Sequence, residues 1–240
     1  MLQVPTDPRL HMAFDIAAWG AGVALTFVLY RWRLRAVTQR VAGLTDRGYF
    51  IALGLGAIFG AYLFGSFDAW RAGLFALSHS LAGALAGAIV SVEGYKLARG
   101  IKGSTGIVFA APLALGIAVG RWGCLFAGLP DGTYGIPWRG PLAVDLGDGV
   151  ARVPVQILES ASMAVFLMLL LWGLWGRRSF ALNEGFYWLA AWYGAQRFAW
   201  EFFKPYPHLV GPFNVFHVLC AGLVAYGITM VVRQRRSAAA

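Results

Sequence analysis

The amino-acid sequence predicts an all-α fold: a polytopic membrane bundle of about seven transmembrane helices, with the N-terminus outside and the C-terminus in the cytoplasm. Of the 240 residues, 59% are hydrophobic and only 13% are charged, whereas about a quarter of the residues of a soluble domain are charged. The mean hydropathy is +0.63. Long apolar stretches alternate with short connections, and every second connection is rich in arginine and lysine. Cationic connections of this kind orient helices in a membrane.

Seven apolar stretches are expected to span the membrane, because about 20 apolar residues cross the hydrocarbon core and Gly-interrupted stretches cross it with some tilt. We expect a single transmembrane domain over residues 1–240. Its first helix is expected to stay uncleaved, because the N-terminal flank lacks a small-residue cleavage site. The expected spans are Phe14–Tyr30, Tyr49–Phe67, Leu74–Val92, Gly106–Trp122, Val155–Trp175, Phe186–Phe202 and Phe213–Val232.

Most cations lie in the connections after the first, third and fifth spans and in the segment after the seventh. The positive-inside rule places these segments in the cytoplasm, so the long connection at about residues 124–153 is expected outside. The rule also accounts for the formal net charge of +9, and we therefore expect no nucleic-acid binding. The cations are Arg31, Arg33, Arg35, Arg40 and Arg47, then Lys96, Arg99 and Lys102, then Arg177 and Arg178, and finally Arg233, Arg235 and Arg236.

Two pairs of glycines with a spacing of four residues predict close packing of helices. Gly83 and Gly87 form one pair in the third span, and Gly116 and Gly120 form the other in the fourth. Small residues at this spacing let two helix backbones approach one another in a membrane.

A polar stripe lies within the sixth span. Tyr193, Arg197 and Glu201 follow one another at intervals of four residues, which places them on one helical face. An arginine near the centre of a span costs about 2.5 to 3.5 kcal/mol on insertion scales, and such residues often mark functional sites. The stripe therefore indicates either an arginine that binds an anion or a structural ion pair between helices.

Further polar residues are expected at the external ends of other spans. Arg121 ends the fourth span, and Gln156 and Glu159 lie on one face of the fifth, where they either bind substrate or cap the helix and fix the loop. His79, beside Ser80, is either a general base or an interfacial hydrogen-bonding residue. Two arginines and a base near the outer leaflet suit a lipid phosphate, because guanidinium groups bind phosphate bidentately. Other histidines expected near the interfaces are His11, His208 and His217.

The two cysteines, Cys124 and Cys220, do not form a CxxC motif and have no histidine at a metal-ligand spacing. The sequence pattern therefore indicates neither a disulfide framework nor a zinc site.

These residues occur in motifs that resemble those of the prolipoprotein diacylglyceryl transferase family over about residues 50 to 230. The family signature is Gly-Arg-x-Gly-Asn-Phe-x-Asn-x-Glu-x-x-Gly. The chain departs from it at Cys124 and Ala127, where the family has asparagine, and at Leu129, where it has glutamate; Asp131 is the nearest carboxylate. The matching motifs are Gly120-Arg121-Trp122-Gly123 with Gly135 as closing glycine, His79-Ser80, Arg152-x-Pro154-x-Gln156-x-x-Glu159, and Tyr193-Gly194-x-x-Arg197-x-x-x-Glu201-Phe202.

The resemblance implies transfer of the diacylglyceryl group of phosphatidylglycerol to the lipobox cysteine thiol of a prolipoprotein, at the outer face of the bacterial inner membrane. It implies no cofactor and no metal. His79 would assist deprotonation of the thiol, Arg121 and Arg197 would bind the phosphate, and Glu201 would orient Arg197. The substrate-binding residues would be Tyr193, Gln156, Glu159, Arg152, Gly123, Cys124, Asp131 and Gly135.

Two alternatives remain open from the residues alone. The signature departures are also compatible with a non-catalytic membrane protein that binds lipid or handles lipoproteins. Alternatively, Cys124 is itself the nucleophile of a lipid or acyl transferase, because it lies one helical turn from Arg121, where a nearby cation favours the thiolate.

Overall fold

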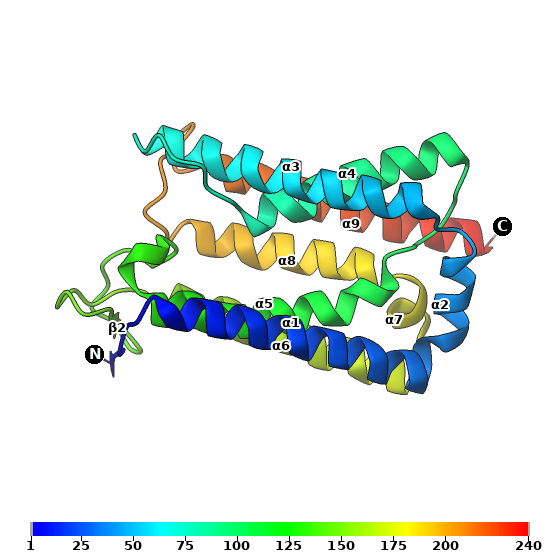
Figure 1. Cartoon of the computed structure of the whole chain (residues 1–240), viewed down its shortest axis with the longest axis horizontal. Helices are drawn as coiled ribbons and strands as arrows, with labels where there is room; N and C mark the ends of the chain where they lie inside the picture. The colour runs from blue at the N-terminus through cyan, green and yellow to red at the C-terminus, as the bar shows by residue number, and fades with distance from the viewer. Residues whose placement is uncertain (1, 240) are drawn as a thin grey trace.

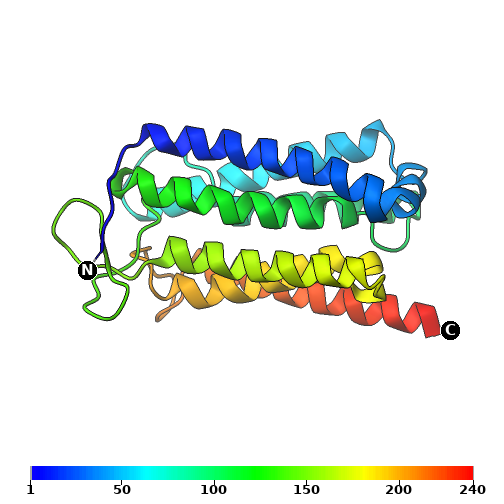
Figure 2. The same ribbon diagram turned by 90° about the horizontal axis from the view of Figure 1, so that it is seen from below.

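The structure is a computed structural model that describes residues 2–239, and its long helices run along a common axis (Figure 1). The turned view in Figure 2 places the long helices of the N-terminal half (blue to green) in one layer and those of the C-terminal half (yellow-green to red) in the other. The elements are β1 (Leu2–Gln3), α1 (Arg9–Leu29), a π-helical turn (Tyr30–Leu34), α2 (Arg35–Ala42), α3 (Arg47–Arg71), α4 (Leu81–Arg99), α5 (Ile107–Ala127), a 3-10 turn (Leu129–Asp131), β2 (Val144–Asp145), α6 (Val155–Trp175), α7 (Ser179–Asn183), α8 (Gly185–Glu201) and α9 (Val215–Ala239).

The predicted all-α membrane bundle is confirmed. Six helical segments of the described chain are long and apolar enough to cross a bilayer, and the chain is a multi-pass membrane protein. Each predicted span coincides with a long helix. The sixth corresponds to α8, which has 17 residues and is at the lower limit for a transmembrane helix.

The two ends of the bundle differ in charge. The N-terminus, β2 and the connection between α5 and α6 lie at one end, whereas α2, α7 and the C-terminus lie at the other (Figure 1). The predicted cationic segments therefore all gather at the second end. By the positive-inside rule, this end is expected to be cytoplasmic. The opposite end, which is called the loop end below, is expected outside.

This orientation predicts opposite results for two reporter fusions. A reporter fused after Gly149, in the loop between α5 and α6, should be active outside the membrane, whereas one fused after Arg178 should be active inside. Paired alkaline phosphatase and fluorescent protein fusions at each site provide the measurement. The reverse pattern at either site would contradict the orientation.

Several boundaries differ from the prediction, and three of these differences are at the loop end. The third span begins at Leu81 rather than Leu74, because Gly73 adopts a φ of 81° and the Ser80 hydroxyl accepts a hydrogen bond from the Gly83 N–H as a helix N-cap. The seventh begins at Val215, after the N-capping Asn214. The fourth continues to Ala127, so Cys124 belongs to α5 and the loop covers residues 128–154.

The α3 and α4 helices pack closely through glycines. A Cβ atom on Gly60 of α3 would clash with the backbone of Gly83 and lie 2.9 Å from the Gly87 Cα. The predicted close approach is therefore confirmed at Gly83 and Gly87. It is wrong for Gly116 and Gly120, because no atom lies within 4 Å of a Cβ at either position.

Gly60→Val is expected to destabilise the protein, because the new side chain would push α3 away from α4. Overpacking of this kind costs about 1 to 3 kcal/mol, and a lower Tm in detergent should report it. Gly54→Val is the matched control on α3, since no atom lies within 4 Å of a Cβ there. Equal Tm values for the two variants would contradict the packing model.

The loop between α5 and α6 is held by the N-terminal segment. β1 pairs in parallel with β2, and the Leu2 and Val4 N–H groups donate to the carbonyls of Ala143 and Asp145 at 2.9 and 3.0 Å. Val4 and Val144 share a small apolar cluster with Leu125 of α5 and Leu146. The loop is therefore packed against the end of the helices, where it covers the site described next.

Candidate active site

A buried group of five charged side chains lies between α5, α6 and α8. We call it the charge cluster, and every member is at most 7% exposed. It consists of Arg121 from α5, Glu159 from α6, Arg197 and Glu201 from α8, and Lys204 from the segment after α8.

Glu159 is the centre of this cluster. Its Oε2 atom lies 2.6 Å from Arg121 Nε, and its Oε1 atom lies 2.6 Å from Lys204 Nζ and 3.6 Å from Arg197 Nη1. One carboxylate of α6 therefore holds cations from two distant parts of the chain, namely α5 and the end of α8 with the segment after it. The structure thus brings together Arg121, Glu159 and Arg197, which the sequence marked as separate candidates.

Glu201 fixes Arg197 from the other side. The two residues are one turn apart on α8, as predicted, and Arg197 Nε donates to Glu201 Oε1 at 2.6 Å. The second carboxylate oxygen accepts a hydrogen bond from Asn214 Nδ2 at 3.2 Å. Asn214 also caps α9, so its hydrogen bond to Glu201 connects the start of that helix to the charge cluster.

The charge cluster holds an excess of positive charge. Three cations, Arg121, Arg197 and Lys204, face two carboxylates, Glu159 and Glu201. Burial and the neighbouring Arg197 lower the pKa of the Lys204 ammonium, whereas the two carboxylates raise it. Charges in a low-dielectric interior interact strongly and are poorly screened, so the cluster is suited to bind an anion.

Two neutral residues near this cluster have free hydrogen-bonding groups. Gln156 and Tyr193 are 1% and 0% exposed, yet the Gln156 amide and the Tyr193 hydroxyl have no hydrogen-bond partner within the described chain. Buried polar groups are nearly always paired. Gln156 lies one turn before Glu159, and Tyr193 one turn before Arg197, so both are placed to bind polar groups of the same substrate.

Three predicted site residues lie apart both from the charge cluster and from the group described in the next paragraph. His79 is exposed in the loop between α3 and α4, and its ring lies 6.5 Å from that of Tyr62. Arg152 donates to both carboxylate oxygens of Asp148 at 2.6 and 2.7 Å, which lowers the pKa of Asp148 to about 2. Gly135 lets the loop pass close to the Val153 backbone. Within residues 2–239, no hydrogen bond or ion pair joins these three residues to the charge cluster.

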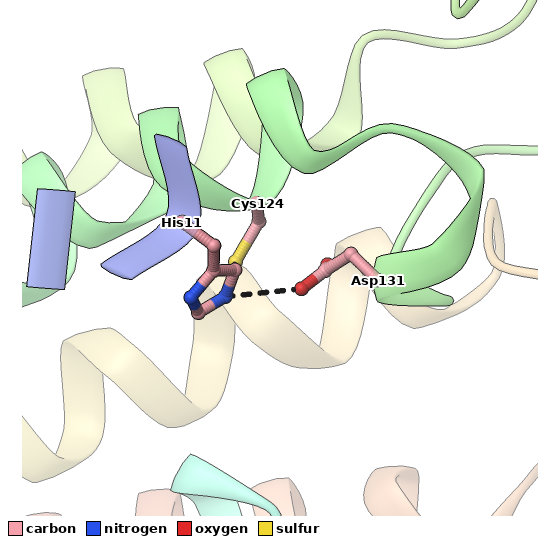
Figure 3. A group of neighbouring side chains, drawn as sticks. All are labelled: His11, Cys124 and Asp131. Atoms are coloured by element: carbon pink, nitrogen blue, oxygen red, sulfur yellow. Dashed lines mark hydrogen bonds and ion pairs between the residues drawn. The ribbon is translucent and has the colours of Figure 1, made fainter. Parts of the chain in front are cut away.

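The other predicted residues assemble around a histidine that was expected only at an interface. His11 of α1 lies against Cys124 of α5 and Asp131 of the 3-10 turn, as Figure 3 shows. One atom from each of the three residues lies within 4.8 Å of the others, a spacing that suits a metal ion. We call this group the His-Cys-Asp cluster. Its Cys124 Sγ lies 3.5 Å from Arg121 Nη1 of the charge cluster.

Lys204, Asn214 and His11 are not among the residues predicted from the sequence. Lys204 could have been found from the sequence, because it follows Glu201 by three residues in an apolar context, a spacing that favours an ion pair. Asn214 directly precedes an apolar stretch, which is typical of a helix cap. The only local signal for His11 is Asp15, four residues later on the same helical face, because its other partners, Cys124 and Asp131, are more than 100 residues away.

An apolar cavity of about 200 Å³ lies between the α3–α4 pair and helices α5, α8 and α9. Its lining extends along α4 from Leu81 to Glu93 and along α5 as far as Ile117. Ile117 is one turn from Arg121, on the same face of α5. The cavity is therefore placed to hold a hydrocarbon chain beside the charge cluster.

Comparison with known proteins agrees with the resemblance found in the motifs. The sequence matches the prolipoprotein diacylglyceryl transferase family over residues 10–233. The phosphatidylglycerol–prolipoprotein diacylglyceryl transferase of Geobacter sulfurreducens is 33% identical over 130 residues, which cover 51% of this chain and 47% of that relative. The chain thus spans about half the length of the curated relative it matches. No solved structure matches the chain. Because the family match extends over almost all of the sequence and includes every residue of both clusters, the chain belongs to the prolipoprotein diacylglyceryl transferase family.

Proposed function

We propose that the protein transfers the diacylglyceryl group of phosphatidylglycerol to the lipobox cysteine thiol of a prolipoprotein, at the outer face of the bacterial inner membrane. Family membership supports the class of reaction. The observation that carries the assignment is the buried, net-positive charge cluster beside the partnerless Gln156 and Tyr193. A lipid phosphate supplies the missing negative charge and the hydrogen-bond partners that this site lacks.

The proposed chemistry is an alkyl transfer. The thiol loses its proton, and a sulfur lone pair forms an S–C bond with the terminal glycerol carbon of the diacylglyceryl group. The C–O bond from this carbon to the phosphate breaks, and glycerol phosphate leaves with the bonding electrons. Negative charge therefore grows on the phosphate oxygen in the transition state, where positively charged donors stabilise it most.

The residues divide these tasks. Arg121 and Arg197 bind the phosphate, and Glu201 orients Arg197 through the 2.6 Å contact with its Nε. Tyr193 and Gln156 bind the polar head group, while the apolar cavity beside Ile117 accepts an acyl chain. His79 lies in the α3–α4 loop at the loop end (Figure 1), and we propose it as the proton acceptor for a thiol that arrives from outside.

The direct test uses purified protein in detergent with phosphatidylglycerol and a peptide that carries a lipobox cysteine. We expect a peptide mass increased by one diacylglyceryl group, together with release of glycerol phosphate. The same peptide with serine in place of cysteine is the control and should stay unmodified. Phosphatidylglycerol that binds without any peptide product would instead support a non-catalytic lipid-binding protein.

One contact favours a second candidate function, in which Cys124 is the nucleophile of a lipid or acyl transferase. Its Sγ atom lies 3.8 Å from His11 Nε2, and His11 Nδ1 lies 2.9 Å from Asp15 Oδ2. A thiol, a histidine and a carboxylate in this order resemble a nucleophile with its base and orienting group. A lipid adduct bound to Cys124 in the wild-type protein, found by mass spectrometry of its peptides, would support this function over the first.

A further inference from the structure

The His-Cys-Asp cluster brings three different donor atoms to one point at the loop end. They come from α1, from the last turn of α5 and from the 3-10 turn of the loop (Figure 3). His11 Nε2 lies 3.1 Å from Asp131 Oδ1 and 3.8 Å from Cys124 Sγ. Within the described chain, no other group of three histidine, cysteine or acidic side chains is arranged so that it could hold a metal ion.

The two separations from His11 Nε2 fit the coordination sphere of a zinc ion. For tetrahedral zinc with ordinary bond lengths, the nitrogen and oxygen ligands lie about 3.4 Å apart and the nitrogen and sulfur ligands about 3.6 Å apart. The observed separations of 3.1 and 3.8 Å differ from these by a few tenths of an ångström. Imidazole and thiolate together favour zinc and similar transition metals over magnesium or calcium.

The residues that hydrogen-bond to the ligand side chains provide independent support for a metal site. The Asp15 carboxylate lies 2.9 Å from His11 Nδ1, and since a carboxylate only accepts, the proton belongs on Nδ1. The Nε2 lone pair is then directed at the cluster. The second carboxylate oxygen of Asp131 accepts a hydrogen bond from Thr133. Metal-binding histidines and carboxylates are usually held by outer partners of this kind.

The nitrogen, oxygen and sulfur donor atoms of this cluster all face one another. His11 Nε2 carries at most one proton, yet it faces both a carboxylate oxygen and a sulfur. A single metal ion satisfies the nitrogen, the oxygen and the sulfur together. The two carboxylates of Asp15 and Asp131 and a Cys124 thiolate also supply enough negative charge to balance a divalent cation and the neighbouring Arg121.

A close approach between helices creates the cluster. A Cβ atom on Gly123 would lie 2.8 Å from the Phe14 Cβ and 3.3 Å from the His11 carbonyl oxygen. Glycine at this position therefore lets α1 lie against α5, which brings His11 beside Cys124. Gly123 was predicted to contribute to substrate binding, and its contact with α1 gives it an indirect role at this site.

We propose that His11, Cys124 and Asp131 bind a divalent transition-metal ion of the zinc class, with a fourth position open to an external thiolate. The catalytic role of this site rests on the proposed function. Three protein ligands and one open position are typical of catalytic rather than structural zinc. Coordination to a metal ion favours the thiolate form of a thiol, and the proton passes to His79, the acceptor proposed above. The resulting thiolate is held beside the charge cluster, because Cys124 Sγ lies 3.5 Å from Arg121 Nη1.

The first test measures metal binding alone. The purified full-length protein is stripped with a chelator and titrated with Co²⁺, whose visible and near-ultraviolet absorption reports tetrahedral geometry and a thiolate ligand. We expect about one ion per chain, with a sulfur-to-cobalt band that zinc removes by competition. His11→Ala, Cys124→Ser and Asp131→Asn should each weaken binding at least 10-fold.

Matched controls are available in the same chain. His208→Ala changes an exposed loop histidine and Cys220→Ala changes a buried cysteine of α9, and both variants should bind Co²⁺ like the wild type. The site would be refuted by absence of the sulfur-to-cobalt band in the wild type. Equal cobalt affinity in Cys124→Ser would refute it as well.

The second test separates the site from the proposed function. A lipobox peptide added to the cobalt-loaded protein, without lipid, should shift the cobalt bands, and the serine peptide should not. Full transfer by metal-stripped protein would overturn the role of the metal while the proposed function stands. Cobalt binding with a peptide-dependent shift but no transfer would leave the metal site intact and contradict the proposed function.

Discussion

Arg197→Ala is expected to reduce diacylglyceryl transfer by about 10²- to 10³-fold, the usual effect of removing one donor that stabilises charge in a transition state. Arg197 is buried and reaches both carboxylates of the charge cluster. Its loss also leaves Glu201 without its closest cation. The transfer rate of the lipobox peptide provides the measurement, after protein amounts in the membrane have been matched.

Arg197→Lys separates charge from geometry. The Arg197 guanidinium group contacts Glu201 through Nε and Glu159 through Nη1. Lysine keeps the positive charge but cannot make both contacts with one planar group, so it should restore little activity. Arg235→Ala is the control, because Arg235 is 58% exposed and pairs with Glu184 near the opposite end of the bundle. Full transfer by both Arg197→Ala and Arg121→Ala would refute the proposed phosphate site.

Glu159→Gln should have the largest effect on stability. The substitution keeps the shape of the side chain but removes the negative charge that holds Arg121, Lys204 and Arg197. Removing one partner of a buried ion pair costs about 3 to 5 kcal/mol, because the remaining charges stay buried and uncompensated. We expect a markedly lower Tm in detergent and loss of transfer.

A double variant tests the cause of this loss. In Glu159→Gln combined with Lys204→Met, one uncompensated cation is gone, so the pair of changes should destabilise less than the sum of the single changes. Glu184→Gln is the matched control: Glu184 is also buried, but its partner Arg235 is 58% exposed, so the cation left behind is solvated and the loss should be smaller. A Glu159→Gln variant with wild-type Tm would contradict the role of Glu159 as the centre of the cluster.

The sequence alone predicts the membrane spans and their expected orientation. Hydrophobic length sets the number of spans, because the bilayer has a fixed thickness, and cations in alternate connections set the expected orientation. The spacing of Arg197 and Glu201 places them on one face of α8 through helical periodicity, and the structure pairs them at 2.6 Å. Such local relations depend only on helix geometry, so they can be read from the chain.

Contacts between distant segments depended on the tertiary structure. The motifs marked Arg121 and Glu159 as candidates, but only the packing of α5 on α6 places their side chains 2.6 Å apart. Lys204 joins them because the chain turns back after α8, and His11 meets Asp131 only after the loop folds against α1. Charges on separate helices pair according to helix rotation and crossing, which packing between side chains decides and helical periodicity does not specify.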